Sequence, residues 1–94
     1  MDIININGQE FRADTIPVCG GVKILVIQNA KGMLGCGYLS VQTAEKLGHA
    51  LAIVTGVADY EDMLNAEVKA VSTAAMQLGI KNGMSGREAL EKLC

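Results

Sequence analysis

The chain has 94 residues, of which 50% are hydrophobic and 19% are charged, and its net charge is −2 at pH 7. This weakly acidic balance excludes the basic surface that a phosphate backbone attracts, so we do not expect a nucleic-acid partner. No apolar run reaches the roughly 20 residues of a membrane-spanning helix and no signal-peptide pattern opens the chain, which predicts a cytoplasmic protein without membrane contact.

The first predicted element is a β-hairpin around Asn7-Gly8. Both central residues of a two-residue hairpin turn need positive φ angles, which Asn and Gly adopt readily. In the register that this turn sets, Ile4 lies opposite Phe11 and Ile6 lies opposite Gln9. The hairpin is therefore expected to have one buried apolar face and one solvent-exposed face.

Two further strands are predicted before the first helix. Residues 22–27 form a nearly continuous apolar run, which is typical of a strand covered on both sides at the centre of a sheet. Residues 33–39 read as a return strand in which Leu34, Cys36 and Tyr38 project to one side.

Capping residues mark the helices that follow. Ser40 is placed to cap a helix that runs to Leu47 and ends at Gly48, and residues 59–64 form a short helix with an acidic first turn. Between these helices, residues 50–55 are β-like.

The last third of the chain is mostly helical. Residues 66–71 are predicted as a strand, although their apolar spacing also fits a helix. Ser72 then caps one helix, and Ser85 with Glu88 forms a capping box for a last helix over residues 86–93. We expect one α+β domain over residues 1–94, in which N-terminal β-hairpins form a mixed sheet of about five to six strands, covered by three to four short helices.

Composition also bears on partners and compartment. Charged residues are few for a small domain with much surface relative to its volume, which predicts that apolar surface contacts a second copy of the chain. Cys19, Cys36 and Cys94 are odd in number and lack the spacing of a disulfide framework. We expect three free thiols in a reducing compartment.

Cys36 is the first candidate for chemistry, because Gly35 and Gly37 flank it and a helix begins shortly after it. Positive potential there favours a thiolate, the nucleophile of thiol-dependent enzymes. The alternative is a small buried hydrophobe, the commoner fate of a free cysteine. His49, the one histidine, is a second catalytic candidate that would act on Cys36 with Asp59 as its orienting group, or else an ordinary surface residue.

A small-molecule site is also predicted at the end of the return strand. Residues 35–40 come close to the glycine fingerprint of dinucleotide-binding proteins, with Ser40 in place of the third glycine. The chain is too short for a complete dinucleotide-binding domain, so a smaller ligand is the prediction that is left. The predicted ligand-binding residues are Gly35, Cys36, Gly37, Tyr38 and Ser40. No paired His and Cys spacing of the zinc type occurs, so we predict neither a metal nor a cofactor.

Four segments in this order, residues 35–39, 43–48, 53–57 and 83–90, resemble the YunC-like family of small bacterial and archaeal proteins. The resemblance runs from about residue 16 to residue 93. It implies an α+β domain of unknown function and carries over no catalytic residue, and His49 stands where the family pattern has an acidic residue. We therefore expect a homo-oligomeric domain that binds a partner or small ligand without catalysis; the alternative is a thiol-dependent enzyme with Cys36 as nucleophile.

Overall fold

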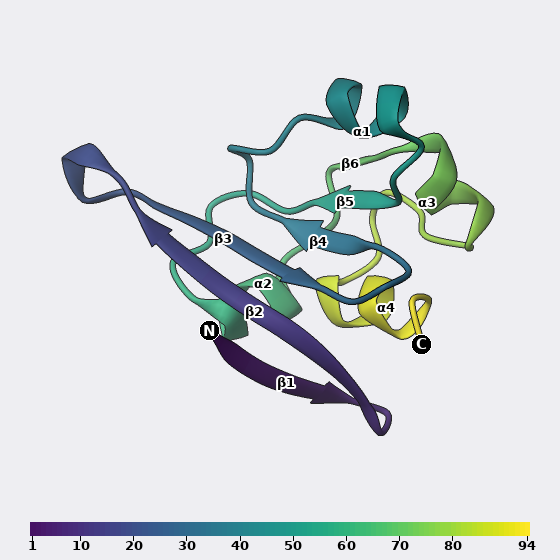
Figure 1. Ribbon diagram of the computed structural model, residues 1–94, viewed down its shortest axis with the longest axis horizontal. Coiled ribbons are helices and arrows are strands. Elements are labelled where there is room, and N and C mark those ends of the chain that lie inside the picture. Colours follow the sequence, from purple (N-terminus) through teal and green to yellow (C-terminus); the bar gives the residue numbers. More distant parts are fainter.

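The computed structural model describes residues 1–94 and contains one six-stranded sheet with the strands in chain order, β1 to β6 (Figure 1). Neighbouring strands are antiparallel except β4 and β5, which are parallel. The sheet is therefore mixed, as predicted. The strands are β1 (Asp2–Ile6), β2 (Gln9–Pro17), β3 (Lys23–Gln28), β4 (Met33–Gly35), β5 (Leu51–Ile53) and β6 (Ala70–Val71).

Four short α-helices follow the N-terminal strands, which confirms the α+β fold class. They are α1 (Val41–Leu47), α2 (Tyr60–Asn65), α3 (Thr73–Gln77) and α4 (Gly86–Glu91), and a short 3-10 turn (Cys19–Gly21) joins β2 to β3. Ser40, Ser72 and Ser85 each accept a backbone N–H at a helix start, as predicted. None of these helices is both long enough and apolar enough to cross a lipid bilayer.

The N-terminal hairpin has the predicted register. Asn7 and Gly8 have φ angles of 52° and 83°, and Ile4 pairs with Phe11 while Ile6 pairs with Gln9. The local turn chemistry therefore fixes which side chains of β1 and β2 face the interior.

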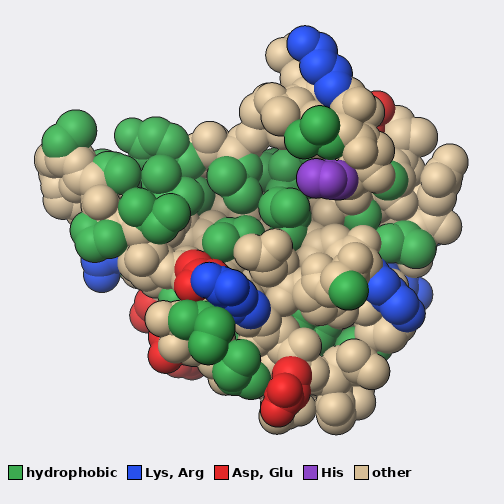
Figure 2. Space-filling model, in the orientation of Figure 1, with side chains coloured by type: hydrophobic (Ala, Val, Ile, Leu, Met, Phe, Trp, Pro, Cys, Tyr) green, Lys and Arg blue, Asp and Glu red, His purple; other side chains and the backbone are tan.

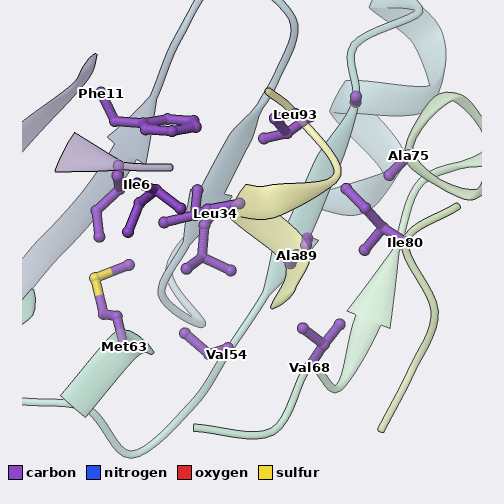
Figure 3. Close-up of a cluster of buried hydrophobic side chains, with 14 of the residues drawn as sticks. Ile6, Phe11, Leu34, Val54, Met63, Val68, Ala75, Ile80, Ala89 and Leu93 are labelled. Atoms are coloured by element: carbon purple, nitrogen blue, oxygen red, sulfur yellow. The ribbon is translucent and has the colours of Figure 1, made fainter. Parts of the chain in front are cut away.

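The main core lies on one face of the sheet, beneath α2 and α4. Figure 3 shows side chains from the N-terminal hairpin, β4 and α4 meeting around Leu34. On the opposite face α1 covers only β4 and β5, where Ala44 packs against Leu51 and Ile53. A helix of this length spans only about 10 Å, so it cannot cover the β2–β3 hairpin as well.

Two strand predictions before α1 were wrong in part. β3 is not covered on both sides, because Ile24 and Val26 lie on the face that α1 leaves open and stay half-buried. β4 ends at Gly35, not at residue 39, because the chain turns where the N–H of Leu39 donates to the carbonyl of Cys36 (3.1 Å). Tyr38 consequently lies exposed instead of alongside the buried Leu34.

Candidate functional site

A cleft opens where the parallel strands β4 and β5 end. The loops that leave these strands lie at the same edge of the sheet, which is the usual place for ligand sites in parallel α/β units. The cleft has a volume of about 210 Å³, and the start of β3 closes its far side. Its lining residues are Val22, Lys23, Cys36, Gly37, Tyr38, Thr55, Gly56 and Val57.

Cys36 forms the inner wall of this cleft and belongs to the main core. Its side chain is only 7% exposed. The backbone N–H of Leu25 donates to the sulfur at 3.4 Å, and the N–H of Cys36 donates to the carbonyl of Leu25 at 3.1 Å. The neighbouring strand β3 therefore holds both the backbone and the thiol of Cys36.

The other predicted ligand residues have different surroundings. Gly37 and Tyr38 line the cleft with Cys36. Gly35 lies outside it and leaves room for Leu39, since a β-carbon at this position would collide with the leucine side chain. Ser40 also lies outside, and its hydroxyl accepts the N–H of Thr43 at 3.2 Å as the cap of α1.

The structure does not bring Cys36, His49 and Asp59 together. Gly35 pairs with Ile53 in the parallel register, so Cys36 follows the carboxyl end of β4 while His49 precedes the amino end of β5. The carboxylate of Asp59 accepts the N–H of Asp62 at 2.8 Å and caps α2. These three residues do not form a hydrogen-bonded catalytic set.

Lys23 and Thr55 line the cleft but were missed by the sequence analysis. Thr55 follows β5 directly, a position at which a polar residue indicates a site once the parallel pairing is known. Lys23 comes from an antiparallel neighbour, and no local pattern marks it. No group of three or more His, Cys, Asp or Glu side chains is placed to hold a metal ion.

All three cysteines are free, as expected, with Cys19 exposed and Cys36 buried. Core packing and the Leu25 N–H therefore hold the Cys36 thiol in place without a disulfide, and Lys23 is the only formally charged side chain that lines the cleft. This arrangement is able to bind a small molecule through hydroxyl groups, backbone amides and one cation.

Comparisons with known proteins place the chain in a family. The family model described as "Domain of unknown function (DUF1805)" matches residues 35–93, which include the cleft loops and all four helices. The uncharacterized protein YunC of Bacillus subtilis (strain 168) is 39% identical over 94 residues, covering 96% of this chain and 92% of that protein. A crystal structure of TA1206, a protein of unknown function from Thermoplasma acidophilum, has a TM-score of 0.92 and 34% identity, covering 99% of this chain and 90% of that chain. The chain therefore belongs to the DUF1805 family, in agreement with its resemblance to the YunC-like proteins.

Proposed function

We propose that this chain is a homo-oligomeric domain of the cytoplasm that binds a small molecule in the cleft at the ends of β4 and β5 and performs no catalysis. The main support for the homo-oligomer is the open apolar face of the sheet. The free thiols support a reducing compartment, and the cleft at the parallel strand ends supports the ligand.

The open sheet face consists of the outward side chains of β1, β2 and β3. Ile16 is 53% exposed and pairs with Ile24, and Val26 lies on the same face. Figure 2 shows hydrophobic side chains gathered over the β2–β3 hairpin. Apolar residues scattered singly need no explanation, but neighbouring ones on paired strands indicate an interaction site.

A second copy of the chain is the partner that fits this face best. Arg12 and Asp14 lie on it and pair with each other at 2.7 Å, which leaves Glu10 as the one unpaired charge among the outward side chains of β2. A face on which neighbouring apolar side chains meet few free charges fits an apolar, self-complementary partner, which a twofold symmetric dimer provides. Packing two such faces together would bury the exposed isoleucines on both copies.

The oligomer is tested with a matched pair of variants. Ile16→Lys places a charge on the open face, whereas Met76→Lys places one on α3, and both native side chains are 53% exposed. Size-exclusion chromatography with light scattering should give the wild-type mass for Met76→Lys and the mass of one chain for Ile16→Lys. Retention of the wild-type mass by both variants would contradict the proposal.

The alternative function, thiol-dependent catalysis by Cys36, is tested through the reactivity of the thiols. Cys36 is buried and its sulfur accepts a hydrogen bond from the Leu25 N–H, while Cys19 is exposed and serves as an internal control. Because alkylation needs access to the thiolate, iodoacetamide should modify Cys19 quickly and Cys36 only as the protein unfolds. Peptide mapping by mass spectrometry measures both rates. Fast alkylation of folded Cys36, with a midpoint near neutral pH, would favour the thiol-dependent enzyme instead.

A further inference from the structure

We infer that a second site, a groove beside α1, binds a small amphipathic carboxylate. The groove runs along α1 from the loop after β4 to the amino ends of β4 and β5, and it shares one lining residue, Tyr38, with the cleft at Cys36. Two cavities of about 290 Å³ each adjoin there, and both are lined by Met33 and His49. We treat these adjoining cavities, which share two lining residues, as the two chemically different halves of one groove.

The half of the groove against α1 is apolar. Most of its lining residues are hydrophobic, among them Met33, Leu39, Leu47 and Leu51. Leu47 is 62% exposed although it lies on the last turn of α1. Covering this side chain with an apolar group would remove its surface from water, which favours binding.

The other half of the groove is polar, and its only charged or chargeable side chains are Lys31 and His49. The ammonium of Lys31 donates one hydrogen bond, to the carbonyl of Cys94 at 2.9 Å, and an ammonium carries further donors. The side chains of His49 and Gln28 make no hydrogen bond within the chain. No Asp or Glu lines either cavity, so no acidic side chain there repels an anion.

The one carboxylate of α1 does not pair with Lys31. Glu45 is directed to α3, where both of its oxygens accept hydrogen bonds from Thr73. One lysine beside one histidine suits a singly charged head group, and the adjoining apolar half suits a short hydrocarbon tail. A monocarboxylate with such a tail therefore matches both halves of the groove.

The test compares hexanoate with hexanamide, which have similar shape and differ in charge. Each is titrated into the full-length ¹⁵N-labelled chain in its native assembly, and amide chemical shifts are followed by NMR. We expect hexanoate to shift the signals of Leu47 and His49 and to bind at least about fivefold more tightly than hexanamide. Equal affinity for the two probes, or no binding of hexanoate, would overturn the inference.

Variants separate the groove from general charge effects. Lys31→Gln and Leu47→Ser should each weaken hexanoate binding by about threefold or more, because they remove a cation and an apolar wall. Lys46→Gln is the matched control, since Lys46 is an exposed cation on α1 that lines neither cavity. An equal loss in Lys46→Gln would contradict the inference. So would hexanoate binding that occurs only in the Ile16→Lys variant, because the groove would then be covered by the second copy.

Discussion

Ser72 is the one fully buried polar residue, and its hydroxyl joins three elements. It donates to the carbonyl of His49 at 2.7 Å and accepts the N–H groups of Leu51 at 2.9 Å and Ala75 at 3.3 Å. The sequence marks Ser72 only as a helix cap, but the structure shows that it also ties α3 to the start of β5. Polar groups that lose such partners while buried destabilise the fold.

Ser72→Ala should therefore lower the free energy of unfolding by about 2–3 kcal/mol, because it leaves the buried Leu51 N–H without an acceptor. Urea unfolding followed by circular dichroism measures the change. Ser40→Ala is the control, since it removes only an exposed cap and should cost about 1 kcal/mol. A loss in Ser72→Ala no larger than in the control would show that its buried hydrogen bonds add nothing.

Gly86 marks the closest approach of α4 to α2. A β-carbon at this position would collide with the carbonyl of Met63, whereas one at Gly37 would make an ordinary contact of 3.4 Å with the Thr55 methyl group. Gly86→Ala should thus cost about 3 kcal/mol by forcing the helices apart, and Gly37→Ala should change stability by less than about 1 kcal/mol. Differential scanning calorimetry compares the two variants. Equal melting temperatures for the two variants would show that the contact between α4 and α2 accommodates a β-carbon at Gly86.

At the scale of elements, a hydrogen-bonded carboxylate connects α1 to α3. The backbone N–H and the hydroxyl of Thr73 donate to the two oxygens of Glu45, and these bonds lower the pKa of that carboxyl from its ordinary value. A carboxyl with a lowered pKa in the folded state stabilises the fold above its unfolded-state pKa. This contribution is lost as the pH falls through the folded-state pKa.

Glu45→Gln should consequently flatten the pH dependence of stability in the acidic range. The urea midpoint of the wild type should fall more steeply between about pH 6 and about pH 3 than that of the variant. Asp2→Asn is the control, because this exposed carboxylate of β1 lies off the open sheet face and should not flatten the curve as Glu45→Gln does. If the urea midpoints of the wild type and of Glu45→Gln fell in parallel as the pH is lowered, the Glu45–Thr73 contact would not contribute to the pH dependence of stability.

Elements set by local chemistry could be predicted, and elements set by distant partners could not. The Asn7-Gly8 turn and the serine caps are local, because a few adjacent residues satisfy the backbone groups involved. The end of β4 depends instead on how Leu39 folds back over Gly35. The predicted strand over residues 66–71 shrinks to β6 (Ala70–Val71) for a related reason, since Val68 bonds to Met84 and Gly83 rather than to β5.

The residues of the candidate site fall into the same two groups, those with a local sequence signal and those placed by distant partners. Cys36, Gly37 and Tyr38, which line the cleft, could be singled out because glycines around a cysteine after a strand are visible in the sequence. Lys23 and Thr55 reach the cleft only through the order of strands in the sheet. The same strand order separates His49 from Cys36, although the two lie only a helix apart along the chain.

At the scale of the whole molecule, the two parts of the chain differ in how they are covered. Residues 35–93, which match the family model, supply the four helices and the cleft loops. The N-terminal strands extend away from this layer as the β2–β3 hairpin, with one face against the core and the other open (Figure 1). The account therefore assigns self-association to the open face of the hairpins and ligand binding to sites at the helical part, to which Lys23 and Lys31 contribute from outside the matched segment.

Native mass spectrometry of the unmodified chain at micromolar concentration tests this assignment most directly. We predict a dominant species whose mass is an integer multiple, two or larger, of the 9.9 kDa chain. A folded species of 9.9 kDa that predominates over the whole concentration range would contradict it, because the apolar face of the hairpins would then be stable in water without a second copy.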